Sequence, residues 1–407
     1  MRIRRSSFVF FYAEENVIPD LSAFLQGQLS AKKSTTIWAL SAIYGKPCAI
    51  EKNILEIFLS FSSSEWTNIE DLEISDILKL ASIGLLLIDD DTEIHKEYLR
   101  REEKLYKEQW NVYAAIYHFL NKWKDFNSDR NIPTDLQELS KRKFLSPKIL
   151  SKFVSEYGNP PEHFHKLKDV QIKGTQTLPL KKDFIDNDPF LQILKTRRTC
   201  REYDDQVSIP QEIFSKLLYM VFGCQAKAHV YEDIWGIKRT SPSGGGLHPI
   251  EAYVLAINIE GITPGIYHYD TEEHKLNAIE YKSMAEAREL ANEFTAGQSY
   301  PRLSSALCIM TARFYRNYWK YRRHPKAYPV LYMDCAHLSQ TFYLACSYFN
   351  LGSFVTGAIN TTNIEEHLKL DPYSESPLLI CGCGVSLENS IGLDPVYTEV
   401  FPPKLSD

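Results

Sequence analysis

The sequence lacks several features that would each point to a particular class of protein. None of its eight cysteines forms a Cys-x-x-Cys pair, and their scatter is typical of buried, reduced thiols. No apolar run approaches a membrane span, because the densest, residues 83–88, soon meets three aspartates at 89–91. An apolar run near the start is interrupted by Glu14 and Glu15, too soon for the core of a signal peptide. The net charge of −6 disfavours general nucleic-acid binding. We therefore expect a cytoplasmic protein that binds no metal, nucleic acid or membrane.

The usual nucleotide-binding loops are missing too. A Gly-x-Gly-x-x-Gly turn between a strand and a helix is absent, and so is a Gly-Lys-Ser/Thr phosphate loop. These two absences disfavour sites for dinucleotides and for nucleoside triphosphates.

The 407 residues exceed one average domain, and the sequence texture divides them into three regions. Residues 1–91 alternate short strands and helices as a winged-helix-like module does; its acidic charge argues against DNA, which leaves a peptide-binding role or simple packing. Residues 92–188 predict a helical connector, with one long helix over 92–126, and then an extended linker. Residues 189–407 alternate helices and strands, among them helices at 211–222 and 284–294 and a strand at 306–313, which predicts an α+β layer domain.

The most informative stretch is Ser-Pro-Ser-Gly-Gly-Gly-Leu-His-Pro at residues 241–249, directly before a predicted strand. Consecutive glycines let the backbone pass close to a flat or anionic ligand, where any Cβ would collide. Gly-rich turns before strands are common, so this loop alone is weak evidence for a site.

A cationic segment, Arg-Arg-Thr-Cys-Arg at residues 197–201, follows a predicted helix. Guanidinium groups match phosphate oxygens in pairs, and the threonine hydroxyl adds one more donor. Taken alone, the segment is better explained as a solvated turn or as a cluster of ion pairs with the nearby acidic residues Glu202, Asp204 and Asp205. Together with the Gly-rich loop, it favours a mononucleotide whose other end is a flat ring.

A third segment, residues 314–323, is dense in aromatic and cationic side chains and contains Lys320 next to Tyr321. Neighbouring positive charge and desolvation both favour a neutral lysine, and positive charge also favours tyrosinate. Either residue could therefore act as a base, and the alternative is a basic surface loop.

These segments together resemble the SagB-type dehydrogenases, a branch of the FMN-dependent nitroreductase superfamily. The resemblance rests on motif order over roughly residues 189–385. Arg-Arg-Thr-x-Arg comes first, then Pro-Ser-Gly-Gly-Gly-x-x-Pro-x-Glu, Pro-Gly-Ile-Tyr-His-Tyr at 264–269, Lys-Tyr, Asp-Cys-Ala-His-Leu-Ser-Gln at 334–340, and Leu-Gly leading to Thr-Gly at 356–357. It implies a nitroreductase-like FMN domain, with a central mixed sheet flanked by helices.

The resemblance also implies roles for individual residues. The FMN phosphate and ribityl chain would be held by Arg197, Arg198, Thr199 and Arg201. The ring system would lie along Pro242, Ser243 and Gly244, supplied by the partner subunit of a homodimer. A backbone N–H near the flavin N5 would come from Thr356, Gly357 and Ala358.

Azoline-oxidising members of that branch carry an adjacent Lys-Tyr, which Lys320 and Tyr321 match. The resemblance therefore implies oxidation of a thiazoline or oxazoline in a ribosomal precursor peptide, in company with a cyclodehydratase. One alternative is an NAD(P)H-dependent flavin reductase of the same fold, acting on a dehydroamino-acid peptide or a nitro-type compound. Another is a non-catalytic scaffold of a peptide-modifying complex. The Arg-His stretch after Lys-Tyr and the N-terminal half both depart from the family pattern.

Overall fold

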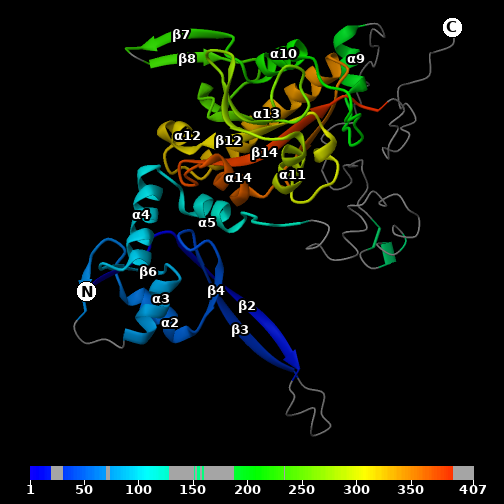
Figure 1. The fold of residues 1–407 in the computed structure, drawn as a ribbon. Coiled ribbons are helices and arrows are strands. Elements are labelled where there is room, and N and C mark those ends of the chain that lie inside the picture. Colours follow the sequence, from blue (N-terminus) through cyan, green and yellow to red (C-terminus); the bar gives the residue numbers. More distant parts are fainter. Residues whose placement is uncertain are drawn as a thin grey trace, which may run out of the picture.

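The computed structural model describes residues 1–19, 31–69, 74–127, 188–232 and 234–387, with a few single positions between 151 and 159. The part of the predicted linker at 160–187 and the segment after residue 387 lie outside the described residues. Within the described part, an N-terminal unit and a larger C-terminal unit are joined through α4 (Glu93–Lys107) and α5 (Val112–Leu120), as Figure 1 shows.

The C-terminal unit is built on a six-stranded sheet in the order β11-β10-β9-β12-β14-β13. Its strands are β9 (Ile250–Ala256), β10 (Gly265–Asp270), β11 (Lys275–Tyr281), β12 (Ala306–Arg313), β13 (Gly352–Thr356) and β14 (Glu375–Gly384). β9 and β12 are the two central strands, and β11 and β13 form the edges.

The predicted mixed sheet is wrong for the described residues, because every neighbouring pair in this sheet is antiparallel. The mixed sheet was an expectation from the family resemblance, and parallel neighbours would need crossover connections. β12 and β13 do run in the same direction, joined by the helical crossover α12 (Phe314–Tyr321) and α13 (Ala327–Tyr348). However, β14 lies between them, so the crossover joins strands that are not neighbours.

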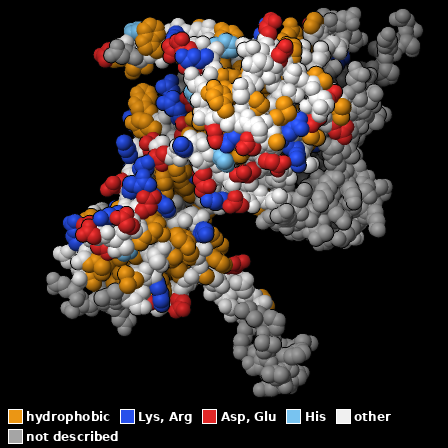
Figure 2. Space-filling view, viewed as in Figure 1, with side chains coloured by type: hydrophobic (Ala, Val, Ile, Leu, Met, Phe, Trp, Pro, Cys, Tyr) orange, Lys and Arg blue, Asp and Glu red, His pale blue; other side chains and the backbone are white. Residues whose placement is uncertain are grey.

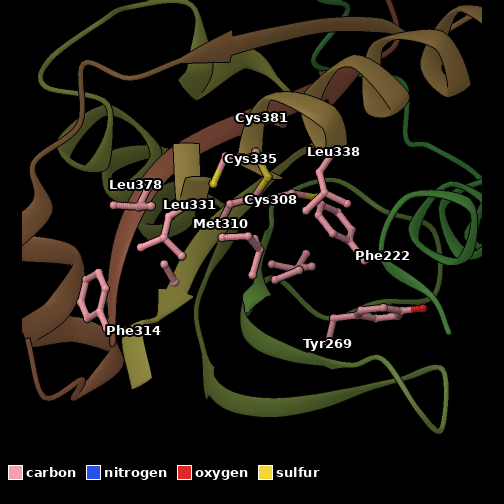
Figure 3. Close-up of a cluster of buried hydrophobic side chains, with 14 of the residues drawn as sticks. Phe222, Tyr269, Cys308, Met310, Phe314, Leu331, Cys335, Leu338, Leu378 and Cys381 are labelled. Atoms are coloured by element: carbon pink, nitrogen blue, oxygen red, sulfur yellow. The ribbon is translucent and has the colours of Figure 1, made fainter. Parts of the chain in front are cut away.

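Helices cover both faces of this sheet, and the period-2 alternation of β12 shows how the layers form. Cys308 and Met310 point into a core shared with α10 (Gln211–Phe222) and α13, whereas Leu307 and Ile309 face α11 (Met284–Phe294) and α14 (Thr361–Leu368). Figure 3 shows the first core, in which Cys308 and Met310 lie beside Cys335, Leu338 and Phe222. The result is an antiparallel sheet between two helical layers.

Local sequence signals explain several helix boundaries in this unit. α9 (Pro189–Thr196) begins after Asp188, whose side chain accepts from two backbone amides, with a proline in the first turn. α11 begins with a capping box between Ser283 and Glu286. Short elements complete the unit: the hairpin of β7 (Ala226–Tyr231) and β8 (Ile234–Lys238), and the 3-10 turns η2 (Gly244–Gly246) and η3 (Pro301–Leu303).

The N-terminal unit contains two three-stranded sheets, in the orders β5-β1-β6 and β2-β3-β4, with α2 (Lys52–Ser60) and α3 (Ile74–Ser82). The strands are β1 (Arg2–Arg5), β2 (Val9–Pro19), β3 (Ala31–Ser41), β4 (Pro47–Ile50), β5 (Thr67–Asn68) and β6 (Leu86–Asp89). The long β2–β3 hairpin extends away from the rest of the unit (Figure 1). The winged-helix-like assignment of residues 1–91 stays a prediction.

The single long helix predicted for residues 92–126 is instead two helices. α4 ends where Gln109 takes a left-handed conformation with φ of 60°, and Asn111 then caps α5 by accepting from the Ala114 amide. The end of α4 is hard to predict from the sequence, because a glutamine occupies the left-handed position that glycine usually takes.

α4 and α5 pack against the C-terminal unit. Trp110, fully buried between them, donates from Nε1 to the Tyr373 carbonyl at 2.9 Å, and Lys104 pairs with Asp371. Among the described residues, no helix combines the length and apolar character needed to cross a bilayer.

Candidate active site

The Gly-rich loop is fixed to α13 by one buried carboxylate. Asp334 is 3% exposed; its Oδ2 accepts from Ser243 Oγ at 2.6 Å and its Oδ1 from the Gly244 amide at 2.9 Å. Ser243 Oγ in turn accepts from the His248 amide at 2.9 Å. A buried carboxylate with two charge-assisted hydrogen bonds holds its partners strongly. The loop is therefore a shaped, anchored element of the site.

Two glycines of the loop cannot be replaced without disturbing their neighbours. A Cβ on Gly244 would collide with Val330 of α13. Gly245 has a φ of +65°, and a Cβ there would lie 2.6 Å from the Tyr321 hydroxyl and 2.9 Å from Lys320 Nζ. The Gly-rich backbone is thus in direct proximity to the predicted catalytic pair.

Lys320 and Tyr321 lie in the last turn of α12, so the segment is helical and is not a surface loop. The helix forms because Phe314, Asn317 and Tyr318 are buried at i, i+3 and i+4 spacing. Lys320 Nζ donates to the Gly245 carbonyl at 3.3 Å, and Nζ lies 5.8 Å from the centroid of the Tyr321 ring.

The cationic segment at 197–201 lies along the edge strand β13. The Cys200 amide donates to the Ser353 carbonyl at 2.7 Å, which fixes the backbone of the segment. Tyr343 of α13 contacts two of its side chains: its ring lies 5.2 Å from the Arg197 guanidinium carbon, and its hydroxyl is 3.0 Å from Thr199 Oγ1. Arg201 lies over the ring of Tyr300.

The segment of Thr356, Gly357 and Ala358 follows the far end of the same strand. Thr356 Oγ1 accepts from the Ala358 amide and from Gln298 Nε2, both at 3.1 Å. The Ala358 N–H is therefore already engaged within the protein. Gly357 is exposed, and its amide has no hydrogen-bond partner among the described residues, so it is the better candidate to face a ligand.

The predicted site residues form two groups that share α13. In the first group, Asp334 holds the Gly-rich loop, and Lys320 and Tyr321 lie beside that loop. In the second group, Tyr343 contacts the cationic segment, and β13 connects that segment to residues 356–358. Nine residues of helix separate Asp334 from Tyr343, about 13 Å along the axis. Within one chain, the phosphate-type donors and the ring-type platform are thus separated along one helix.

Three residues with a part in this arrangement were given no site role from the sequence: Asp334, which was quoted only as part of the motif at 334–340, and Tyr343 and Gln298, which were not singled out at all. Only Asp334 left a readable signal. It falls on the buried stripe of α13 with Leu331, Cys335 and Leu338, where an ionisable residue is unusual and needs a partner.

Burial and two arginines keep the histidine at the end of the loop neutral. Burial, then Arg239 and Arg316, lower the pKa of His248 to about 4, so His248 is neutral at pH 7. Arg239 is buried and donates to the Ile250 carbonyl at 2.9 Å. In the part of the chain that the structure describes, no three His, Cys, Asp or Glu side chains are grouped as a metal site requires.

Comparison with known families fits this arrangement. Residues 194–385, somewhat under half of the chain, match the model of the Nitroreductase family. This part of the chain is similar to nitroreductase-family domains. The match includes both groups of site residues and the six-stranded sheet, and it ends just after β14.

Two individual relatives are each less than 30% identical to the matched part of this chain. The chain is 29% identical over 181 residues to the trifolitoxin-processing protein TfxB of Rhizobium leguminosarum bv. trifolii, covering 43% of this chain and 48% of TfxB. It is 28% identical over 196 residues to MJ1384 of Methanocaldococcus jannaschii, a protein that is named as a nitroreductase. That alignment covers 48% of this chain and 90% of MJ1384. The match thus spans about half the length of TfxB.

Among solved structures, the E. coli microcin synthetase McbBCD complex with truncated pro-MccB17 matches with a TM-score of 0.41 and 18% identity. That match covers 61% of this chain and 98% of the McbBCD chain.

Proposed function

We propose that this protein is an FMN-dependent dehydrogenase that oxidises thiazoline or oxazoline rings of a ribosomal precursor peptide to thiazole or oxazole. The observation that carries the proposal is the position of Lys320 and Tyr321 against the backbone of the Gly-rich loop. The similarity to nitroreductase-family domains and to a trifolitoxin-processing protein supports it.

The residues present suit FMN by the chemistry of their donors. Arg197, Arg198, Thr199 and Arg201 would hold the phosphate and ribityl chain, since three guanidinium groups and a hydroxyl match a phosphate dianion. Pro242, Ser243 and Gly244 would lie along the ring system, and Gly357 would offer a backbone N–H. FMN, when bound, would supply the hydride acceptor that the reaction needs.

The part of the protein in the chemistry is then to position the ring and to remove a proton. Aromatisation of the azoline supplies the driving force, so a positioned base is the main requirement. The Gly245 carbonyl fixes Lys320 Nζ at the loop, and the half-buried Tyr321 lies beside it. One of these two side chains would take the ring proton, and the other would orient it.

The test uses a synthetic peptide that contains a thiazoline, followed by mass spectrometry for loss of two hydrogens. Lys320→Ala and Tyr321→Phe should keep FMN but slow turnover by about 10²- to 10⁴-fold, the usual contribution of general base catalysis. Full turnover in both variants would remove the proposed base. Wild-type protein that leaves the azoline unchanged but reduces a nitro compound with NAD(P)H would instead establish the reductase alternative.

The same proposal includes a cytoplasmic homodimer, a precursor peptide and a cyclodehydratase partner. A purified protein without flavin and without turnover would favour a scaffold role in a peptide-modifying complex. Peptide binding by residues 1–91 belongs to this proposal as well, and the open edge of β2 is where an added strand would pair.

A further inference from the structure

The surface of α12 that faces solvent is strongly cationic. Residues 313–326 contain six Lys or Arg and no Asp or Glu, although the whole chain carries a net charge of −6. Figure 2 shows Lys and Arg side chains gathered where α12 and α4 approach each other. Of these six cations, only Arg313 has an ion pair among the described residues, with Glu251 at 3.1 Å. Most of the positive charge in residues 313–326 therefore has no acidic ion-pair partner among the described residues.

Exposed aromatic side chains lie among these cations. Tyr315 is 43% exposed and Trp319 is 48% exposed, and their i, i+4 spacing places them together on one face of the helix. Arg316, at the same spacing from Lys320, lies next to them. We call Tyr315, Arg316, Trp319, Arg322 and Arg323 the α12 surface. It offers flat apolar area beside guanidinium groups, a combination that protein interfaces favour.

The α12 surface is continuous with the candidate active site. Arg316 Nε donates to the Leu247 carbonyl at 2.8 Å, so its guanidinium is held at the end of the Gly-rich loop. At the far end, Arg323 lies 4.9 Å from the centroid of the Tyr106 ring on α4. The surface thus runs from the Gly-rich loop to the N-terminal part of the chain.

We propose that the α12 surface binds an acidic segment of the peptide substrate, with a carboxylate on Arg316 and an aromatic or aliphatic neighbour against Trp319 and Tyr315. This inference rests on the proposed function. Arg316 lies about 6 Å along the helix from Lys320, which corresponds to about two residues of an extended peptide. A substrate carboxylate about two residues from the reacting ring therefore fits this geometry.

Two other anions fit less well. A nucleic acid needs a cationic track matched to its phosphates, whereas the α12 surface is short and the chain is acidic overall. A second copy of this chain would bring a net charge of −6, but the aspartates of its acidic run at 89–91 already pair with Arg2, His95 and Lys96. Both occupants are outcomes of the test.

The test measures fluorescence anisotropy of a labelled octapeptide of alternating Glu and Phe, against the full-length protein, with a matched Gln–Phe peptide. The Glu peptide should bind at least about tenfold more tightly at low salt, and this preference should shrink as salt rises. The double variant Arg316→Gln/Arg323→Gln should lose the preference. Arg302→Gln, which removes an exposed arginine paired with Glu289, should keep it.

Charge reversal makes the test specific. Arg316→Glu should prefer a Lys–Phe peptide over the Glu peptide, which a general loss of stability would not produce. Equal binding of Glu and Gln peptides, or equal losses in the Arg302→Gln control, would overturn the proposal. Tighter binding of a single-stranded oligonucleotide than of the Glu peptide would assign the α12 surface to a nucleic acid. Peptide binding that is lost only on dimerisation would assign the surface to a second copy of this chain.

Flavin content and azoline turnover are measured on the same samples. Selective peptide binding without azoline turnover would refute the proposed function and leave the α12 surface standing. If an azoline peptide is turned over with no dependence on Arg316 or on a nearby substrate carboxylate, the proposed function stands and the proposed role of the α12 surface is refuted.

Discussion

Gly244 and Gly246 lie two residues apart, yet the chain needs glycine at each for a different reason. A Cβ on Gly244 meets Val330, whereas a Cβ on Gly246 meets nothing within 4 Å and only the φ of +68° is unfavourable. Gly244→Ala should therefore displace the loop and cost about 1–3 kcal/mol, as overpacking does. Gly246→Ala, the matched control, should cost about 1 kcal/mol from backbone strain alone.

Urea denaturation and flavin content of both variants measure the difference. Adding Val330→Ala should restore the Gly244→Ala variant, because it removes the colliding methyl, and should do nothing for Gly246→Ala. If Val330→Ala fails to rescue, the loop does not depend on this contact.

Asp334 is the second residue on which the loop depends. Asp334→Asn keeps the shape but turns one acceptor into a donor that faces Ser243 Oγ or the Gly244 amide. Leaving a buried donor unsatisfied costs about 1–3 kcal/mol, so we expect a lower midpoint of urea denaturation and weaker flavin retention. Thr341→Val on the same helix, which loses the hydroxyl contacts to Ser241 and to the His337 carbonyl but no charged hydrogen bond, should be milder. Equal effects would mean that Asp334 is no special anchor.

At the scale of elements, the segment just after α5 is attached to α14 of the C-terminal unit by a buried ion pair. The side chains of Lys122 and Glu365 are 12% and 6% exposed, with Nζ 2.6 Å from Oε1, and Ser376 also donates to that carboxylate. Lys122→Met leaves the buried Glu365 charge without its countercharge, which typically costs about 3–5 kcal/mol. The double variant Lys122→Met/Glu365→Gln should recover much of the loss in urea denaturation. No recovery would show that the lysine acts through packing on Phe119 instead.

His118 on α5 makes stability depend on pH. Burial lowers its pKa well below the ordinary value of 6.5, and Lys122 adds to the effect, while His118 Nδ1 lies 2.9 Å from the Tyr328 hydroxyl. The folded protein therefore resists protonation that the unfolded chain accepts. Stability should fall as pH drops below about 6.5, by at most about 1.4 kcal/mol per pH unit for this residue. His248, with its pKa lowered to about 4, should add to the loss in the same window.

Urea midpoints from pH 7.5 to 4.5 measure this dependence, and His118→Phe should flatten it while keeping an aromatic ring beside Trp110. An unchanged slope in His118→Phe would assign the acid sensitivity to other groups.

The sequence predicted the elements whose hydrophobic period was clean, and missed those defined by long-range pairing. The helices at 211–222 and 284–294 and the strand at 306–313 have the predicted bounds. The β2–β3 hairpin was missed, because β2 runs from consecutive aromatic residues into two glutamates without alternation and has no buried face. The antiparallel order was missed because β14 inserts between strands that follow one another in the chain. Strand insertion depends on the whole fold and leaves no local trace.

The candidate site was predictable where residue type alone carries the chemistry, as in the arginines at 197–201 and the glycines at 244–246. Contacts between side chains of different helices, strands and loops were not predictable. Nothing local in the sequence indicates that Tyr343 meets Thr199, or that Lys320 reaches the Gly245 carbonyl 75 residues away.

At the scale of the whole molecule, exposed apolar side chains on α9 and α13 fit the expected homodimer. Phe190 is 60% and Leu194 41% exposed on α9, and Met333 is 56% exposed on α13. We expect Met333→Lys to shift the protein towards monomer in light scattering, because a buried lysine at an interface is costly. Val207→Lys, also at an exposed apolar position, should leave the mass unchanged. A monomeric wild-type protein that retains flavin would contradict the dimer.

The central claim is that the nitroreductase-like domain holds FMN through the cationic segment at 197–201. The most direct measurement is the flavin released from purified protein by denaturation, quantified by absorbance against protein concentration. The wild type and Arg302→Ala should release stoichiometric FMN, whereas Arg201→Ala should release little while remaining folded by circular dichroism. Undiminished FMN in Arg201→Ala, or a wild-type protein that never binds FMN, would contradict the account.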